Sequence, residues 1–462
     1  MNLSYPQDDT LSLLKAGKLV GSKHLKLNCG LTQFPAEIFT LADTLERLDL
    51  SGNLLDSLPD DLDKLHKLRI IFCSSNRFTH LPEVLGKCPN LSMIGFKANK
   101  IDTFSDVAIP TTNLRWLILT DNALTKLPDT VGHCQHMQKL MLAGNQLSEL
   151  PKSLANCHKL ELLRISANRF ESLPEWLFAL PKLSWLAYAG NPFSDRIENE
   201  LMSQQHIPEI NWHDLKIRQL LGEGASGLIY QAELQTDINQ TGTVETNDVA
   251  VKMFKADLTS DGLPHSEIHA TALAGNHTHL FGLKGIVIDH PNDEIGMVMP
   301  LMDQSLTVLA KPPSFESCSR DVYAEDTQLL LESILRIAHA IASTIAHLHA
   351  KGMTHGDLYA HNILNNETAS KVILSDLGAA SFLPPDNLAQ SQQLQRIESH
   401  AFACLLEELL NHRVLNTDVT DSDIAQKLWQ LQAECAQDTT AKRPLFDEIE
   451  TRIQAIRLST LI

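Results

Sequence analysis

The segment that decides the fold of the second half of the chain reads His355-Gly356-Asp357-Leu358-Tyr359-Ala360-His361-Asn362. Three other motifs accompany it in a fixed order: Gly222-Glu223-Gly224-Ala225-Ser226-Gly227, Val249-Ala250-Val251-Lys252 and, behind it, Asp376-Leu377-Gly378. Each motif alone is weak evidence, because a GxGxxG pattern arises by chance and any buried strand can carry a lysine. The four together, in this order and at workable spacings, are strong evidence of one pattern rather than chance.

The glycine-rich loop lies between two predicted strands, at residues 215–221 and 228–234. Alternating apolar and polar side chains after the loop favour the second strand. This strand–loop–strand arrangement differs from the strand–loop–helix of a dinucleotide-binding fold. Glycines let backbone amides approach phosphate groups without a Cβ clash. The second half therefore resembles the eukaryotic-type protein kinase family, which implies a two-lobed α+β fold that uses ATP and Mg²⁺.

Lys252 lies in an apolar, strand-like run, where a cation needs a partner. The resemblance implies that it pairs with the α- and β-phosphates of ATP and with a helix glutamate. Glu267 is the only glutamate between Lys252 and Gly275, so we assign it that role; the alternative is a surface glutamate. The resemblance further implies that Asp357 is the base for the substrate hydroxyl. It makes Asn362 and Asp376 the Mg²⁺ ligands, which suffice because this cation takes phosphate and water oxygens as well.

The adenine site is expected after a buried strand at residues 295–299. Matching to the family pattern places Met299 at the gatekeeper position and Pro300-Leu301-Met302 at the hinge, with the Pro300 carbonyl and the Met302 amide toward adenine. The nucleotide-binding residues implied by the resemblance are Gly222, Glu223, Gly224, Ala225, Ser226, Gly227, Lys252, Pro300 and Met302. The resemblance makes residues 355–362 the catalytic loop. An apolar helix at residues 327–350 leads to this loop, and Gly352 is the stop signal of the helix.

The chain departs from the family pattern at several positions. Gly356 replaces the arginine that would receive an activation-loop phosphate, so activation by that route is not expected. Tyr359 replaces the lysine usual in serine/threonine kinases, and the arginine of tyrosine kinases is also missing. An Ala-Pro-Glu motif is absent, Glu398 stands where the family has an aspartate, and Arg443 lacks its usual glutamate partner. The acceptor class stays open, with serine or threonine favoured over tyrosine.

The first half of the chain repeats every 23 residues. An asparagine marks each repeat, at Asn53, Asn76, Asn99, Asn122, Asn145, Asn168 and Asn191. The surrounding pattern, LxxLxLxxNxLxxLP, defines the leucine-rich repeat, and a degenerate first copy begins at Lys23. Leucines point inward, the asparagine amide satisfies backbone groups, and each coil adds one strand to a parallel sheet on the concave side. Capping helices are expected through Leu14 and over residues 194–205.

Two columns of variable strand positions face the concave side. The first column reads Arg47, Ile70, Met93, Trp116, Lys139, Leu162 and Trp185, and the second reads Asp49, Phe72, Gly95, Ile118, Met141, Arg164 and Ala187. Neighbouring side chains cover one another on this apolar stripe, or the kinase half packs on it, or it binds a protein. We favour a protein-binding face, because contiguous exposed apolar patches mark interaction sites.

Composition indicates which classes of partner are disfavoured and which cellular compartment is expected. The formal net charge is −18, which disfavours nucleic acid and anionic membrane surfaces as partners. Cys134 and Cys157 lie one repeat apart and Cys88 two repeats before Cys134, so these cysteines are expected to be small buried residues rather than disulfide partners. Neither a signal peptide nor a membrane-spanning apolar run is evident, and a reducing cytoplasm is expected.

These features predict a leucine-rich-repeat α/β solenoid with caps at residues 1–205, a linker at 206–212 and a protein kinase domain at 213–462. The expected function is ATP-dependent phosphorylation of a protein hydroxyl, with a protein partner or substrate on the concave repeat face. The alternatives are a pseudokinase scaffold that acts through its repeats and a kinase-fold enzyme that acts on a small molecule. The oligomeric state does not follow from the sequence.

Overall fold

The computed structural model describes residues 7–224, 226–239, 243–259, 261–415 and 419–458 of the 462-residue chain. Contacts divide the chain into two compact units, Met1–Leu183 and Ser184–Ile462. This division falls ahead of the boundary at residue 205 that the sequence suggests for the repeat domain. The eighth copy of the repeat, which carries Asn191, therefore lies in the second unit.

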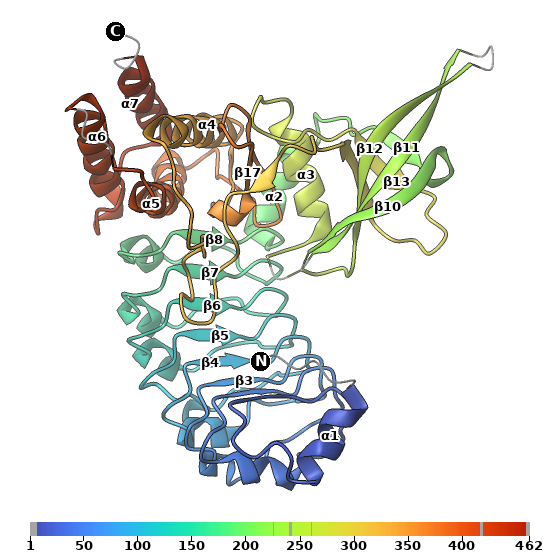
Figure 1. Ribbon diagram of the computed structural model, residues 1–462, viewed down its shortest axis with the longest axis vertical. Helices are drawn as coiled ribbons and strands as arrows, with labels where there is room; N and C mark the ends of the chain where they lie inside the picture. The colour runs from blue at the N-terminus through green and yellow to red at the C-terminus, as the bar shows by residue number, and fades with distance from the viewer. Residues whose placement is uncertain (1–6, 225, 240–242, 260, 416–418, 459–462) are drawn as a thin grey trace. The chain divides into compact units, whose positions relative to one another are not determined.

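The first unit is a solenoid of short parallel strands (Figure 1). Its strands are β1 His24–Lys26, β2 Arg47–Asp49, β3 Ile70–Phe72, β4 Met93–Gly95, β5 Trp116–Ile118, β6 Lys139–Met141 and β7 Leu162–Arg164. The return segments form 3₁₀ helices: η1 Ala36–Leu41, η2 Leu62–Lys64, η3 Glu83–Lys87, η4 Asp106–Ala108, η5 Asp129–His133, η6 Lys152–Asn156 and η7 Glu175–Ala179. Helix α1, Gln7–Lys15, is the predicted first cap.

Each strand lies in register with the next at a spacing of 23 residues, so that Arg47 lies opposite Ile70 and Ile70 opposite Met93. The repeat asparagines satisfy backbone groups, as predicted, and their bonds also link neighbouring coils. Asn53 accepts the amide of Leu31 at 2.9 Å through Oδ1 and donates to the carbonyls of Leu27 and Leu50 at 2.8 Å. Equivalent bonds recur at Asn76, Asn99, Asn122, Asn145 and Asn168.

Cys88, Cys134 and Cys157 are buried and form no disulfide, as predicted. Burial raises the pKa of Cys134 to about 12 and that of Cys88 and Cys157 to about 11. These thiols therefore stay protonated at neutral pH and fill space as small apolar groups.

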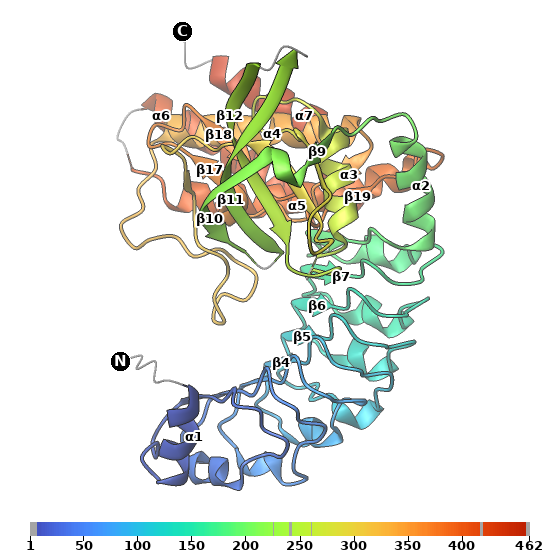
Figure 2. The same ribbon diagram turned by 90° about the vertical axis from the view of Figure 1, so that its right-hand side faces the viewer.

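The second unit begins with strand β8, Trp185–Ala187, and helix α2, Pro192–Met202. A six-stranded sheet follows, in the order β10-β11-β12-β14-β13-β9 (Figure 2). Its strands are β9 Glu209–Asn211, β10 Leu215–Glu223, β11 Gly227–Asn239, β12 Thr243–Phe254, β13 Gly285–Ile288 and β14 Gly296–Pro300. Helix α3, Pro264–Ala274, lies beside this sheet, and Ala232, Val249, Val251 and Val298 are in its core.

The remainder of the second unit is mostly helical. Its helices are α4 Leu331–Ala350, α5 Leu388–Asn411, α6 Val419–Cys435 and α7 Phe446–Leu458. Short strands pair beside them: β15 Thr307–Val308 with β17 Ile363–Asn365, β17 with β18 Val372–Leu374, and β16 Met353–Thr354 with β19 Ser381–Phe382. The predicted two-lobed α+β arrangement is confirmed. Helix α4 begins at Leu331, four residues later than expected.

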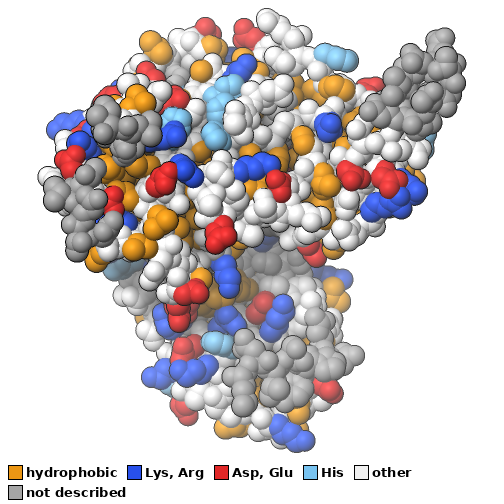
Figure 3. Space-filling model, turned by 45° about the horizontal axis from the view of Figure 1, so that its top comes forward, with side chains coloured by type: hydrophobic (Ala, Val, Ile, Leu, Met, Phe, Trp, Pro, Cys, Tyr) orange, Lys and Arg blue, Asp and Glu red, His pale blue; other side chains and the backbone are white. Residues whose placement is uncertain are grey.

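The surface carries charges of both signs. On the face in Figure 3, basic and acidic side chains are interspersed among the described residues, as on an ordinary solvated protein surface. No helix in the described part of the chain is both long and apolar enough to cross a bilayer.

Candidate functional site

A cavity of about 350 Å³ lies in the second unit between the six-stranded sheet and the helical part. It brings together most of the residues singled out from the sequence, although they come from distant segments. Its lining includes Gly222, Lys252, Glu267, Met299, Pro300, Met302, Asn362 and Asp376.

Lys252 of β12 and Glu267 of α3 form a buried ion pair, as the resemblance implied. The lysine needs this partner because its strand packs among apolar side chains. Burial alone would lower the pKa of Lys252, but the carboxylates of Asp376 and Glu267 outweigh it, and the pKa lies above its ordinary value. Burial raises the pKa of Glu267 to about 7, against the attraction of Lys252. The cavity thus holds a buried ammonium beside two carboxyl groups.

A hairpin of β17 and β18 brings Asn362 and Asp376 to one end of the cavity. Asn362 directly precedes β17, Asp376 follows β18, and Ile363 pairs with Leu374. The amide and hydroxyl of Ser375 both donate to the Asn362 carbonyl at 2.9 Å. Asn362 and Asp376 are distant in the sequence, and the hairpin brings them close together in space.

The catalytic loop is held by its own hydrogen bonds. Asn362 Nδ2 donates to the carbonyl of Asp357 at 2.9 Å and to its Oδ2 at 2.8 Å. The Asp357 amide donates to His355 Nδ1 at 3.2 Å, so His355 Nε2 carries the proton that it donates to the Ser375 carbonyl at 3.1 Å. These contacts give His355 a structural part, in which it helps to orient Asp357.

Asp376 has a left-handed backbone, with φ of +61°, which is uncommon for a residue other than glycine. Its Oδ1 accepts the amide of Gly378 at 3.0 Å, and this local turn is of the kind that aspartate supports. Strain of this sort persists where the surroundings enforce it and is common at functional sites.

The donor set fits Mg²⁺. The Asp376 carboxylate and the Asn362 amide oxygen are hard ligands, and the amide nitrogen of Asn362 is already engaged with Asp357. Among the described residues, no three His, Cys, Asp or Glu side chains cluster as a metal site. This is compatible with a site that phosphate and water oxygens complete, rather than a closed protein cage.

The hinge contributes more residues to the lining of the cavity than the glycine-rich loop does. Pro300 and Met302 line the cavity, and Met299 lies next to them at the predicted gatekeeper position. In the loop, Gly224 donates its amide to the Gly227 carbonyl at 3.0 Å, and Glu223 pairs with Lys255 at 2.5 Å. Ser226 accepts the amide of Lys255 at 3.2 Å, whereas Ala225 lies outside the described residues.

Glu398 supports the catalytic loop from α5. It is buried and accepts the Gly356 amide at 2.8 Å, the His355 amide at 3.3 Å and the Nε2–H of His349 at 2.8 Å. Burial raises the pKa of Glu398, but the hydrogen bond and charge of His349 help to outweigh it, and the pKa lies below its usual value. The sequence placed Glu398 in the family's aspartate position but did not reveal these partners.

Arg443 is buried and donates to backbone carbonyls, from Nε to Gln437 at 2.8 Å and from Nη1 to Arg396 at 3.2 Å. Carbonyl groups therefore contact this guanidinium in a chain that lacks the Ala-Pro-Glu glutamate. Burial lowers its pKa to about 10, which still leaves it charged.

Several residues of the predicted concave binding face, including Met93, Leu162 and Trp185, are buried rather than exposed, and Trp185 has a different role. Trp185 is only 1% exposed, and its ring stacks on Tyr359 within the second unit, with 4.1 Å between centroids. Its assignment to a docking stripe was wrong, because the kinase part of the chain covers it. The alternative explanation, in which the kinase half packs on the stripe, holds for this residue.

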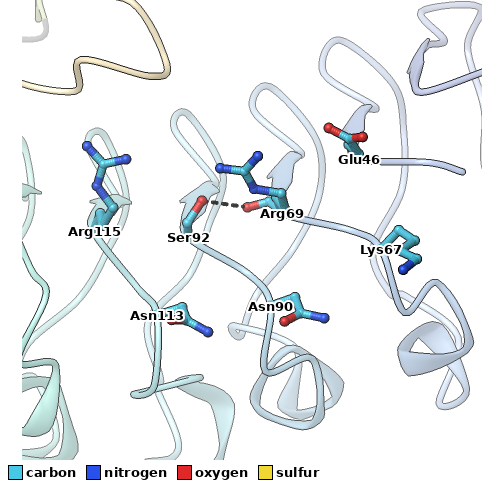
Figure 4. Close-up of a pocket in the computed structure, with 7 residues that line it drawn as sticks. All are labelled: Glu46, Lys67, Arg69, Asn90, Ser92, Asn113 and Arg115. Carbon is cyan, nitrogen blue, oxygen red and sulfur yellow. Dashed lines mark hydrogen bonds between the residues drawn. The ribbon is translucent and has the colours of Figure 1, made fainter.

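A second, shallow hollow of about 480 Å³ lies in the first unit, along the segments that lead into β2 to β5 (Figure 4). Its lining is Glu46, Lys67, Arg69, Asn90, Ser92, Asn113 and Arg115. Glu46 is paired with Lys23 at 2.8 Å, and that hydrogen bond holds the pKa of Glu46 below its ordinary value. The hollow therefore presents three cationic side chains and one carboxylate that already has a partner.

Comparison with known proteins gives two kinds of match. Residues 215–421 match the family model for protein tyrosine and serine/threonine kinases, and residues 44–65 and 112–170 match leucine-rich-repeat models.

Relatives are distant. The chain is 24% identical to the serine/threonine-protein kinase PkaB of Streptomyces coelicolor, over 52% of this chain and 62% of the relative. It is 25% identical to the protein sevenless of Drosophila melanogaster, over 38% of this chain and 7% of that protein. A probable serine/threonine-protein kinase of Dictyostelium discoideum is 22% identical over 55% of this chain and 29% of the relative. The chain thus spans less than two thirds of each of these proteins.

Proposed function

The chain carries leucine-rich repeats followed by a protein kinase domain, and we propose that it is an active ATP- and Mg²⁺-dependent kinase of protein hydroxyl groups. The observation that carries this proposal is the single cavity that holds the Lys252–Glu267 pair together with Asn362 and Asp376. A scaffold that only signals by shape has no need for a buried lysine paired in this way, since buried ion pairs contribute little to stability.

Each side chain has a distinct part in the proposed reaction. Lys252 binds the α- and β-phosphates, and Glu267 keeps its ammonium directed at them. Asp357, oriented by Asn362 and His355, accepts the proton of the attacking hydroxyl. Asn362 and Asp376 would hold Mg²⁺, which would supply positive charge against the charge that develops on the phosphates.

Serine or threonine is the proposed acceptor. The relatives from Streptomyces and Dictyostelium bear that specificity in their names, and this supports the choice. Tyr359, at the position of the usual lysine, is buried against Trp185, so it does not replace that lysine at the phosphates. The proposed nucleotide contacts are Gly222, Glu223, Gly224, Ala225, Ser226, Gly227, Lys252, Pro300 and Met302, and the proposed compartment is the cytoplasm.

Asp357→Asn tests the proposed function. Because a positioned general base contributes at least about a hundredfold, transfer of labelled phosphate to dephosphorylated casein should fall by about that factor. Asp326→Asn, an exposed aspartate ahead of α4, is the matched control and should retain wild-type turnover. A wild-type protein that binds ATP but labels no protein favours the scaffold, and one that labels only small acceptors favours a small-molecule kinase.

We further propose that the repeat unit binds a protein partner through its concave face beside the basic hollow. Trp116 of β5 is half-buried, with Lys139 Nζ 4.8 Å from its ring centroid and Met141 Sδ 3.3 Å from its Nε1. An aromatic side chain held in this way by its neighbours is a typical anchor of an interface. The nearby cations Lys67 and Arg69 favour a partner segment rich in acidic residues.

Reversing the charge of the hollow should weaken capture of such a segment. For the double variant Lys67→Glu, Arg69→Glu, we expect at least tenfold weaker binding of a fluorescent Asp/Glu-rich peptide at low salt. The control Lys87→Glu, Lys152→Glu makes the same charge change on η3 and η6 and should bind like wild type. Equal loss in both variants would mean that only net charge matters and would contradict a site at the hollow.

A further inference from the structure

The last copy of the repeat pattern belongs to the catalytic unit. Residues 184–202 contain β8, the repeat asparagine Asn191 and the capping helix α2, and all lie within the compact unit that contains the kinase domain. Asn191 donates to the Tyr188 carbonyl at 2.8 Å, as the other repeat asparagines do within their own coils. We call residues 184–202 the eighth coil.

Trp185 of the eighth coil contacts the catalytic loop directly. Its Nε1–H donates to the Leu358 carbonyl at 2.8 Å, and its ring stacks on Tyr359 with 9° between the ring planes. The ring centroids of Tyr359 and His361 in turn lie 5.0 Å apart, and His361 Nδ1 is hydrogen-bonded to Asp321 Oδ1 at 2.8 Å. The two residues that follow Asp357 are therefore fixed by a buried tryptophan.

A backbone carbonyl of the eighth coil and one of the segment after Asp376-Leu377-Gly378 lie beside Gly356, where the kinase family has an arginine. Gly356 has φ of +75°, and a Cβ on it would lie 2.4 Å from the Ala379 carbonyl oxygen and 2.9 Å from that of Leu186. Any side chain there would collide with both segments. Glycine at this position is thus required by the positive φ and by the close approach of two carbonyl groups, of which the Leu186 carbonyl belongs to β8.

The same coil holds the segment that follows Asp376-Leu377-Gly378. Tyr188 donates from its amide to Ser381 Oγ and from its hydroxyl to the Phe382 carbonyl, both at 2.9 Å. Ser184 Oγ is bonded to His400 Nδ1 at 2.7 Å on α5. Ser381 is fully buried, so it is closed to modification in this arrangement.

Helix α2 holds α3 on both sides of Glu267. The buried carboxylate of Glu198 accepts Ser266 Oγ–H at 3.1 Å through Oε2 and lies 2.6 Å from His269 Nδ1 through Oε1. Figures 1 and 2 both show α2 beside α3. Because Glu267 lies between these two contacts, its distance to Lys252 depends on α2.

We propose that the eighth coil is a built-in positioning element of the kinase domain, in which Trp185 fixes the catalytic loop and Glu198 fixes α3. It takes the place of the contact between an arginine and an activation-loop phosphate, which Gly356 makes impossible. The catalytic geometry is then set when the chain folds, without a phosphorylation step. The proposal rests on the proposed kinase function for its effect on turnover, but its structural part stands separately.

Trp185→Phe is the sharpest test, because phenylalanine keeps an aromatic ring against Tyr359 but removes the Nε1–H donor and part of the ring volume. In the full chain we expect kcat of the folded protein to fall about tenfold and KM for ATP to stay within twofold, while the melting temperature falls because the smaller ring leaves a gap in a buried site. Trp429→Phe, at an exposed tryptophan of α6, is the matched control and should match wild type. A purely structural tryptophan would lower the melting temperature but leave kcat of the folded fraction unchanged, and that result overturns the proposal.

Hydrogen exchange supplies a readout that needs no activity. Peptides covering residues 353–364 should exchange at least threefold faster in Trp185→Phe than in wild type, and those covering α3 should do so in Glu198→Gln. Glu200→Gln, at an exposed glutamate of the same helix, should exchange like wild type. If the wild-type protein shows no kinase activity but both variants exchange faster than wild type, the proposed function fails and the positioning role stands. If exchange is unchanged in both variants, only the positioning role fails.

Discussion

Lys252→Met should reduce phosphotransfer about a thousandfold while the protein remains folded. The ammonium is buried and paired with Glu267, and Asp376 adds a second carboxylate to the same cavity. Preorganised charge of this kind acts in a low-dielectric site, where removing a single donor costs about a hundred- to a thousandfold. Methionine has a similar length and no charge, so it removes the ammonium and keeps most of the packing.

The effect on stability should be small in comparison. Replacing one partner of a buried ion pair leaves the other charge uncompensated, but burial already raises the pKa of Glu267 to about 7, so it can take up a proton at little cost. Turnover of ATP and the thermal melt should therefore be measured on the same sample. Lys284→Met, at an exposed lysine just ahead of β13, is the matched control. Near-wild-type turnover in Lys252→Met would remove the basis for the proposed kinase function.

Much of the site could be predicted because its chemistry leaves local traces. A lysine in an apolar strand indicates a partner of opposite charge, and Glu267 is the only glutamate between Lys252 and Gly275. The repeat was equally legible, since a period of 23 residues fixes which leucines and asparagines stack. In both cases the signal lies within a short segment or in a strict period.

The contacts that support the site could not be predicted from the sequence, because they join residues that are far apart in it. Glu398 and Gly356 are bonded across 42 positions of sequence, and Trp185 and Leu358 across 173. Nothing local to Trp185 distinguishes it from Trp116, because both occupy the same column of the repeat. The repeat pattern continues through Asn191 without interruption, so the sequence does not show that the last coil packs as part of the second unit.

Gly356 illustrates how a departure from a family pattern acquires a physical reason. From the sequence it was only a missing arginine. In the structure it is a residue with positive φ beside two carbonyl oxygens, and its amide is a donor to Glu398. The absence of a side chain at residue 356 and the close approach of the Ala379 and Leu186 carbonyls thus belong to one packing arrangement.

Asp376→Asn should weaken Mg²⁺-dependent nucleotide binding far more than Asn362→Ala does. Asp376 is the only one of the two proposed ligands with a formal charge, and hard dications prefer carboxylate oxygen. The asparagine variant should therefore lose about a thousandfold in turnover, whereas Asn362→Ala should lose about tenfold in Mg²⁺ affinity. Part of the Asn362→Ala effect should appear in kcat instead, because this side chain also donates to Asp357 at 2.8 Å.

Titrating Mg²⁺ against the affinity for a fluorescent ATP analogue separates the two roles. In the absence of Mg²⁺, all variants should bind the analogue equally weakly, since adenine and Lys252 contacts are unchanged. With Mg²⁺ added, wild type and Asp386→Asn, an exposed aspartate ahead of α5, should gain affinity together. Asn362→Ala should need about tenfold more Mg²⁺ for the same gain, and Asp376→Asn should show almost none. Equal losses in both ligand variants would contradict the ranking, because they would mean that ligand geometry rather than charge determines how the metal is held.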